Sequence, residues 1–256
     1  MLEREETNDV FICKKFKSLK DLPDNSVIGS ASLRRQAQLL AVNPTLKVVN
    51  FRGNVQTRLK KIENGRESFN INYKIYFYLH FIYSSEVVDA TLLALAGLKR
   101  LGMSDVISTS QIIEWEEMLP AVAQGAIGIQ CRTNDEKILG YLSVLNHVNT
   151  KTAVDCERSF LAELDGNCRT PIAGQAKIDS SSNTLVFEGL ISKPDGSDMI
   201  RVKRQGSAAD AVSLGRDAAL EIKAIAGAKF CEYGEAVQIV QEEAAAAKAA
   251  AKSNSG

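Results

Sequence analysis

The chain has 256 residues, of which 45% are hydrophobic and 24% charged, and its formal net charge is zero. This composition is typical of a globular protein with one or two cores, and the balanced charge gives no overall attraction to nucleic acid or to a membrane. The only histidines are His80 and His147, and the chain has no G-x-S-x-G or H-E-x-x-H motif, which disfavours a Ser-His-Asp hydrolase and a histidine-rich metal site.

The first informative unit is a predicted strand that runs into a turn of small residues and then into a helix, over residues 27–36. Free backbone N–H groups and the positive end of the helix dipole favour an anion at such a turn. Ser30 and Ser32 are small enough to let a ligand approach, and Arg34 and Arg35 would add charge-assisted hydrogen bonds. Two arginines on a solvated helix face explain this stretch alone equally well.

Two further units repeat the plan. Residues 46–65 predict a strand, a turn with Arg52 and a helix with Arg58, and residues 88–102 predict a strand and a short helix bearing Arg100. In open α/β sheets, ligands bind beyond the carboxyl ends of the strands. Three successive turns would bring arginine to that edge, so the pattern favours an anion-binding edge.

The pattern of elements predicts two folded units. From about residue 10 to 119, strands and helices alternate as in a doubly wound α/β domain. From about 148 to 234 the order is helix, three strands and helix, with hairpin signals at 180–183 and 194–196, which predicts a small α+β domain. Residues 235–256 form a low-complexity tail with nothing to bury.

Five cysteines, an odd number with no C-x-x-C pair, argue against a disulfide framework and against a zinc site. The ordinary interpretation of any one of them is a small buried hydrophobe or an idle thiol. Cys168 differs because it lies in a predicted glycine-containing loop beside Arg169, where a thiolate could be stabilised.

Five segments, taken in chain order, form a more specific pattern. They are Gly-Ser-Ala-Ser-Leu-Arg-Arg-Gln at 29–36, Phe-Arg-Gly-Asn-Val-Gln-Thr-Arg-Leu at 51–59, Leu-Ala-Gly-Leu-Lys-Arg-Leu-Gly at 95–102, Leu-Pro-Ala-Val-Ala-Gln-Gly-Ala-Ile-Gly-Ile at 119–129, and Leu-Asp-Gly-Asn-Cys-Arg-Thr-Pro-Ile at 164–172. This pattern resembles the porphobilinogen deaminase (hydroxymethylbilane synthase) family from about residue 3 to about residue 233, apart from one interruption.

The resemblance implies a domain plan. Residues 10–119 would be the family's second domain, with a periplasmic-binding-protein-like α/β fold, and residues 148–234 its cofactor-bearing C-terminal domain. Residues 1–9 would be the end of the first domain with its hinge, and residues 120–147 would cross back to that first domain.

The resemblance also implies an activity. Family members join four porphobilinogen units into hydroxymethylbilane, with release of ammonia, on the route to heme and chlorophyll. The chain grows on a dipyrromethane cofactor held by a cysteine. Each pyrrole carries an acetate and a propionate, so planar, permanently charged guanidinium groups suit the ligand. The implied partner is porphobilinogen alone, without nucleic acid or membrane, and the implied state is a monomer.

By position, the resemblance assigns cofactor-binding roles to Cys168 (covalent attachment), Ser30, Ser32, Arg34, Arg35, Arg52, Arg58, Gln124 and Gly125. It assigns substrate binding to Arg100 and implies no metal. Cys168 follows Asn167 where the family more often has a second glycine, which is a mild departure because asparagine tolerates left-handed backbone.

The first larger departure concerns the family's N-terminal domain, which has no counterpart in this sequence. Its His-Ser-Met-Lys-Asp stretch carries the family's central catalytic aspartate, so no catalytic residue can be assigned, and we expect the chain as given to be inactive. Any targeting region would also lie outside this sequence. The resemblance implies a plastid location in algae and plants and a cytoplasmic one elsewhere.

The second departure is the segment 66–88, where seven aromatic residues lie between Phe69 and Tyr83. It is too short and too polar for a membrane span, and a helix-to-strand connection needs only about 2–6 residues. We interpret it as an unspliced intron translated in frame, with a genuine lineage-specific insertion as the alternative.

Two other functions remain open on the sequence alone. One is a non-catalytic carboxylate-binding α/β module, since the α/β unit with its arginines at the sheet edge would bind anions without any contribution from Cys168. An RNA-contacting protein is disfavoured, because aromatic residues are not interleaved with the arginines outside the segment 66–88.

Overall fold

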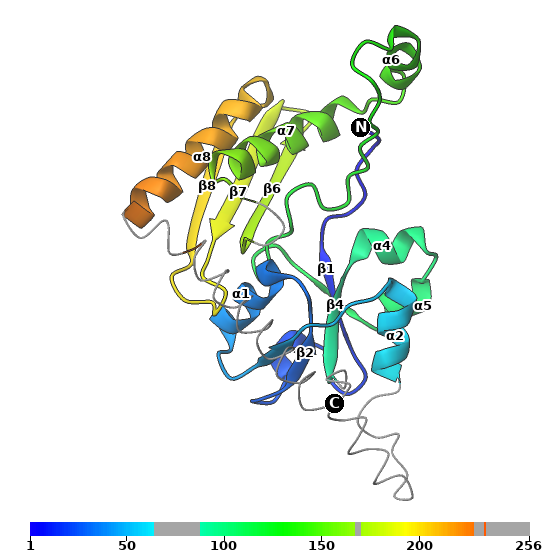
Figure 1. The fold of residues 1–256 in the computed structure, drawn as a ribbon, viewed down its shortest axis with the longest axis vertical. Coiled ribbons are helices and arrows are strands. Elements are labelled where there is room, and N and C mark those ends of the chain that lie inside the picture. The colour runs from blue at the N-terminus through cyan, green and yellow to red at the C-terminus, as the bar shows by residue number, and fades with distance from the viewer. Residues whose placement is uncertain (64–87, 167–169, 228–232, 234–256) are drawn as a thin grey trace, which may run out of the picture.

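The computed structural model describes residues 1–63, 88–166, 170–227 and 233 (Figure 1). The predictions for Cys168, for nearly all of the segment 66–88 and for the tail 235–256 therefore lie outside the described residues. The described chain forms one mixed sheet with helices on both faces and one antiparallel sheet covered by two helices. This arrangement confirms the predicted α/β domain followed by a small α+β domain, whereas the exact domain boundaries stay predictions.

The first sheet has the strand order β3-β2-β4-β1-β5. Its strands are β1 (Asp9–Cys13), β2 (Val27–Gly29), β3 (Lys47–Val49), β4 (Ala90–Ala94) and β5 (Gln111–Ile113). β2 pairs in parallel with β3 and β4, whereas β1 lies between β4 and β5 and is antiparallel to both. The carboxyl ends of β2, β3 and β4 therefore share one edge.

Alternating side chains on the central strands explain why helices cover both faces. Phe11 and Leu92 belong to one buried cluster, whereas Val10 and Leu93, their neighbours along β1 and β4, belong to another. Because successive strand residues point to opposite faces, both faces are apolar and both need cover. The helices of this layer are α1 (Leu33–Val42), α2 (Val55–Glu63), α4 (Leu95–Arg100) and α5 (Ser104–Ser108), and a short 3-10 turn spans Leu19–Asp21.

The N-terminal segment (residues 1–8) lies beside the connecting segment (residues 114–135), which links β5 to the next helix. The Leu2 amide donates to the Ile127 carbonyl (3.2 Å), and the Glu5 amide donates to the Gly125 carbonyl (3.3 Å). The connecting segment leads to α6 (Glu136–Ser143), which projects from the top of the molecule in Figure 1 and buries none of its residues.

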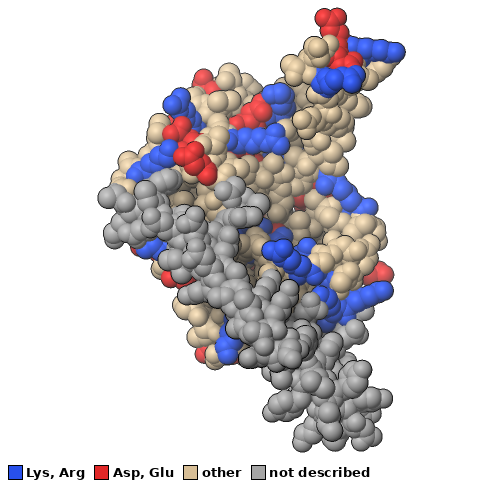
Figure 2. Space-filling model, viewed as in Figure 1, with Lys and Arg blue, Asp and Glu red and all other residues tan. Residues whose placement is uncertain are grey.

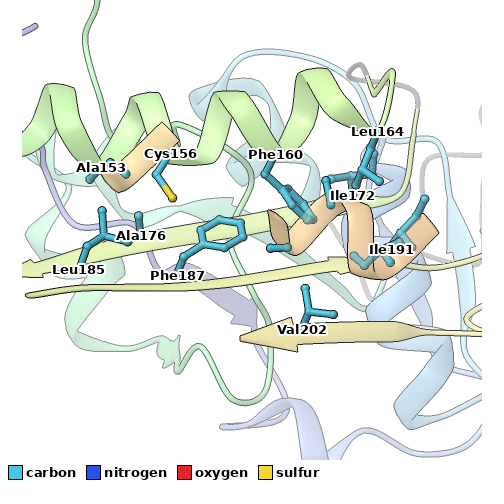
Figure 3. Packing of buried hydrophobic residues seen from close by; sticks show 14 of the residues in the cluster. Ala153, Cys156, Phe160, Leu164, Ile172, Ala176, Leu185, Phe187, Ile191 and Val202 are labelled. Atoms are coloured by element: carbon cyan, nitrogen blue, oxygen red, sulfur yellow. The ribbon is translucent and has the colours of Figure 1, made fainter. Parts of the chain in front are cut away.

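The C-terminal unit consists of α7 (Val148–Glu163), β6 (Ile172–Asp179), β7 (Thr184–Ile191), β8 (Ile200–Ser207), a 3-10 turn (Ala208–Asp210) and α8 (Ala211–Ala226). Both predicted hairpins are present, and the two helices pack on one face of the antiparallel sheet. Phe160 and Phe187 meet at the centre of the core, with ring centroids 5.0 Å apart (Figure 3). A side chain on Gly215 would place a Cβ 2.1 Å from the Cys156 carbonyl oxygen, so glycine lets α7 and α8 approach closely.

Charges of both signs alternate over the surface of the C-terminal unit (Figure 2). Exposed ion pairs account for part of this pattern, including Arg204 with Asp217 and Arg216 with Glu163. Exposed pairs of this kind contribute about 0–1 kcal/mol each, so they add little to stability.

The turn between β7 and β8 joins the two units. Gln36 on α1 donates from Nε2 to the Pro194 carbonyl (3.2 Å). Gly196 has a φ of 81°, and a Cβ there would lie 2.3 Å from the backbone nitrogen of Ala41. The turn therefore lies directly against the helix that carries Arg34 and Arg35.

Candidate anion-binding site

The turn before α1 is held in shape by its own serines. The Ser30 amide donates to the Val49 carbonyl (2.9 Å), which continues the pairing of β2 with β3. The Ser30 hydroxyl oxygen accepts from the Ser32 amide (3.2 Å), and the Ser32 side chain caps α1 by accepting from the Arg35 amide (3.4 Å). Both serines therefore build the helix start that the sequence predicted.

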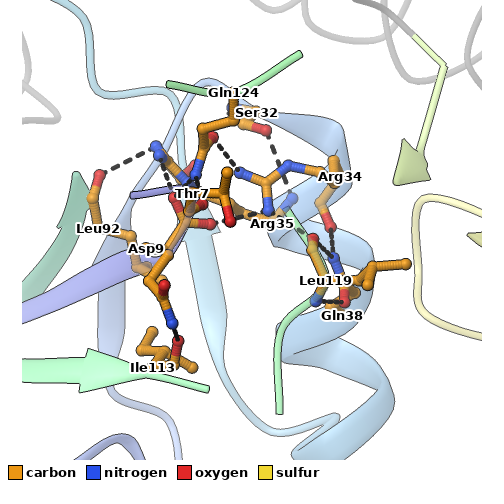
Figure 4. A network of polar contacts seen from close by, with 12 residues as sticks. Thr7, Asp9, Ser32, Arg34, Arg35, Gln38, Leu92, Ile113, Leu119 and Gln124 are labelled. Atoms are coloured by element: carbon orange, nitrogen blue, oxygen red, sulfur yellow. Dashed lines mark hydrogen bonds and ion pairs between the residues drawn. The ribbon is translucent and has the colours of Figure 1, made fainter. Parts of the chain in front are cut away.

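Arg34 and Arg35 are buried side by side against one carboxylate, that of Asp9 (Figure 4). Arg34 Nη1 lies 2.8 Å from Asp9 Oδ2, and Arg35 Nη2 lies 2.7 Å from Asp9 Oδ1. Each guanidinium also donates to a backbone carbonyl, Arg34 to Leu119 (2.9 Å) and Arg35 to Leu92 (3.0 Å). The two arginines are thus 6% and 8% exposed, which differs from the ligand-facing arrangement that the sequence suggested.

Asp9 is a buried anion whose charge is stabilised by its neighbours. Burial alone would favour the protonated acid, but Arg34 and Arg35 outweigh burial and hold the pKa of Asp9 well below its usual range. Burial lowers the pKa of Arg34, and Asp9 opposes this effect. The Nε atoms of both arginines have no hydrogen-bond partner within the described part of the chain, so each retains a donor that a further acceptor could use.

Gln124 and Gly125 of the connecting segment reach the same region. Gln124 Nε2 donates to the Thr7 carbonyl (2.5 Å) and to Asp9 Oδ1 (3.1 Å). Gly125 has a φ of 81°, and a Cβ there would lie 2.4 Å from the Glu5 carbonyl oxygen, so the position favours glycine. The Gly125 carbonyl accepts from Arg100 Nη2 (2.7 Å). The structure therefore brings Gln124 to the arginine pair and Arg100 to Gly125.

Arg52 and Arg58 lie at the neighbouring turn, before and within α2. Arg52 is exposed, and its Nε donates to Asn50 Oδ1 (3.2 Å). Arg58 is half-buried, and its Nε donates to the Gly53 carbonyl (2.8 Å). Burial lowers the pKa of Arg58, and the positive charge of Arg35 lowers it further, so these two cations lie in one electrostatic neighbourhood.

The sequence did not reveal a second buried ion pair, which stabilises the same region. Arg4 contacts both carboxylate oxygens of Glu157 (2.6 and 3.0 Å) and donates from Nε to the Gln124 carbonyl (2.9 Å). Glu157 also accepts from the amides of Ala123 (2.7 Å) and Ala176 (2.8 Å). Burial raises the pKa of Glu157 against the opposing effect of Arg4. The pair ties the N-terminal segment, the connecting segment and the C-terminal unit together.

Comparison with known proteins identifies the family of this chain. Residues 1–140 match the family model described as "Porphobilinogen deaminase, dipyromethane cofactor binding domain", and residues 151–224 match "Porphobilinogen deaminase, C-terminal domain". The chain belongs to the porphobilinogen deaminase family. Its first 140 residues therefore lie in the family's dipyrromethane cofactor-binding domain.

Individual relatives agree with this family. The chain is 50% identical over 231 residues to the chloroplastic porphobilinogen deaminase of Oryza sativa and 49% identical over 232 residues to that of Pisum sativum. It is 45% identical over 229 residues to the porphobilinogen deaminase of Nitrobacter winogradskyi. Each alignment covers 90% of this chain but only 58%, 56% and 65% of the respective relative. The chain thus spans less than two thirds of the length of these relatives.

The donor set of the site fits a ligand with several carboxylates. Guanidinium groups bind carboxylates through paired N–H donors, and the Nε atoms of Arg34 and Arg35 are buried donors left over after Asp9 is bound. Arg52 and Arg58 are more accessible than the buried pair. No helix in the described ranges is long and apolar enough to span a membrane.

The charge of Asp9 predicts a specific acid sensitivity. Because its folded pKa lies below the unfolded value of about 3.9, Asp9 stabilises the fold at higher pH, and this contribution is lost as the pH falls below about 4. Asp9→Asn should lower the free energy of unfolding by about 3–5 kcal/mol at pH 7, because it leaves two buried guanidinium groups without their anion. The difference from wild type should shrink toward pH 2, as measured by urea unfolding at a series of pH values.

Glu157→Gln provides the control, because the pKa shift of Glu157 has the opposite sign. Its raised folded pKa means that its contribution to stability decreases as the pH rises through its titration range. A deficit of Asp9→Asn that stayed constant from pH 7 to pH 2 would show that Asp9 is not held ionised by the two arginines.

Proposed function

We propose that this chain forms the arginine-lined cofactor and substrate site of a porphobilinogen deaminase, a transferase that joins four porphobilinogen units into hydroxymethylbilane and releases ammonia. The observation that carries the proposal is the convergence of Arg34, Arg35 and Arg58 at the edge of the first sheet, within the segment that matches the family's cofactor-binding domain.

The accessibility of each arginine suggests a division of roles. Arg52 and Arg58 bind acetate and propionate groups directly, and Arg100 binds those of the incoming substrate or of the growing chain. A hydrogen bond to a charged group in a partly buried site contributes about 1.5–3 kcal/mol, against about 0–1 kcal/mol for an exposed pair. Arg34 and Arg35 supply a fixed positive potential to the site. They also supply their two Nε donors, which Asp9 does not bind.

Dipyrromethane, when bound through Cys168, supplies the primer from which the pyrrole chain grows. The chain's own residues bind and orient the carboxylates of the primer, with Ser30 and Ser32 shaping the turn and Gln124 linking it to the connecting segment. We assign no catalytic acid or base, because the two fully buried carboxylates in the described ranges that contact arginine, Asp9 and Glu157, are both held in ion pairs.

The same relatives suggest where the protein works. The rice and pea relatives are named chloroplastic. We propose a plastid location if the source is an alga or plant and a cytoplasmic location otherwise. We also propose that the protein is a monomer with porphobilinogen as its small-molecule partner and without nucleic acid or a membrane as partners.

A chimera tests the proposed function. The matched 231-residue segment of the rice relative would be replaced by the corresponding part of this chain without residues 67–87, and the product incubated with porphobilinogen. We expect a covalent adduct with the mass of dipyrromethane, measured by intact-protein mass spectrometry, and formation of hydroxymethylbilane. The parent rice enzyme is the positive control, and the 256-residue polypeptide alone is expected to keep its unmodified mass.

The outcome separates the transferase from the non-catalytic module. If the chimera folds and binds a small dicarboxylate such as succinate but forms neither adduct nor product, the chain is a carboxylate-binding module and the transferase proposal is wrong.

A further inference from the structure

Asp9 occupies a central and rigid position in the first sheet. It is the first residue of β1, which pairs with β4 at Ala94 and with β5 at Ile113. Its side chain is fully buried and contacts Arg34 at 2.8 Å, Arg35 at 2.7 Å and Gln124 at 3.1 Å. The carboxylate therefore has little freedom to move away from the arginines.

The charges around Asp9 do not balance within the cluster. Asp9 supplies one negative charge against the positive charges of Arg34 and Arg35, and Arg58 is near enough to Arg35 to affect its own pKa. Like charges repel strongly where water is excluded, so the arginine pair needs an anion even when no ligand is bound. Asp9 contributes the same chemical group, a carboxylate, that a pyrrole ligand would present.

We propose that Asp9 is a positioning residue that acts as a resident counter-ion: it holds Arg34 and Arg35 in place in the ligand-free protein and limits how strongly the cluster attracts external anions. The identity of the natural ligand rests on the proposed function, whereas the counter-ion role rests only on the contacts of Asp9. In this arrangement Asp9 lowers the affinity of the arginine pair for the ligand, but it keeps both guanidinium groups in position before the ligand binds.

The test compares the stabilisation that an added anion gives to wild type and to Asp9→Asn. Thermal midpoints of the 256-residue protein would be measured against sodium phosphate, and separately against succinate, at constant ionic strength. Asp9→Asn should melt lower than wild type without these anions, and its midpoint should rise by about 5 °C more than that of wild type when they are saturating. If Asp9→Asn fails to fold in dilute buffer, phosphate should restore a cooperative transition.

Two controls separate a counter-ion from a merely structural residue. Thr91→Val removes a buried hydroxyl that donates to the Gly29 carbonyl (2.8 Å) in the same sheet, without changing the charge. It should lower the midpoint but respond to phosphate as wild type does. The double variant Asp9→Asn with Arg35→Gln restores the net charge of the cluster, so its extra response to anions should disappear.

The proposal fails if Asp9→Asn and Thr91→Val gain equally from phosphate, or if the double variant stays as anion-dependent as Asp9→Asn. Neither result depends on porphobilinogen, so a failed turnover assay of the chimera would leave this inference standing. Conversely, a failed anion test would leave the transferase proposal intact.

Discussion

In the chimera, Arg58→Leu is expected to weaken substrate and cofactor binding about 10- to 100-fold and to leave the unfolding midpoint almost unchanged. The half-buried Arg58 donates only to the Gly53 carbonyl among the described contacts of its side chain, so its loss disturbs little of the fold. The fold-change follows from the roughly 1.5–3 kcal/mol that a hydrogen bond to a charged ligand contributes. Cofactor occupancy by intact mass and KM for porphobilinogen would measure it.

Arg35→Leu should behave differently, because Arg35 is buried against Asp9 and donates to the Leu92 carbonyl. We expect loss of activity together with a loss of about 3–5 kcal/mol in the free energy of unfolding, since one partner of a buried pair is removed. Arg132→Leu is the matched control, because Arg132 is 82% exposed and pairs only with Asp135 among the described residues. Normal activity in Arg58→Leu, or unchanged stability in Arg35→Leu, would contradict these assignments.

The fold was predictable because its signals are local. Consecutive apolar residues on β1 and β4 point alternately into two separate cores, and this pattern requires helices on both faces of the sheet. The Ser32 cap and the turn at Pro194–Gly196 also follow from local residue preferences. The antiparallel direction of β1 was not predictable in the same way, since strand direction depends on partners far away in the sequence.

The grouping of arginines was predictable from the sequence, whereas their contacts were not, and the binding roles of these residues stay predictions. Arg34 and Arg35 are adjacent on α1, where side chains point about 100° apart, yet their long side chains converge on one carboxylate. That carboxylate is Asp9, which binds one nitrogen of each guanidinium. No local pattern links Asp9 to residues 25 or more positions later, which is why the sequence did not reveal this carboxylate.

Arg4 and Glu157 were missed for the same reason, since they lie 153 residues apart. One signal was available: Glu157 lies between Ala153 and Phe160 on the apolar face of α7, where an unpaired carboxylate would be costly. A charged residue on the buried face of a helix predicts a buried partner, although it does not say which one.

The largest effect on function is expected at Cys168, whose replacement by alanine should abolish the covalent adduct and all turnover in the chimera. Within the described chain, Pro171 is three residues after Cys168 in the sequence, and its carbonyl accepts from the Ser192 amide (3.1 Å), shortly before the turn whose Gly196 packs on α1.

The other thiols provide the controls for this experiment. Burial, followed by the charge of Glu157, raises the pKa of Cys156 to about 12, so this thiol is protonated and unreactive at neutral pH. Cys131→Ala and Cys156→Ala should therefore both keep the adduct, although Cys156→Ala should lower stability because it leaves a small cavity in the core. Intact mass distinguishes the variants directly. An adduct that persists in Cys168→Ala and disappears in Cys131→Ala would move the attachment site to the connecting segment and remove the role that the resemblance gives to Cys168.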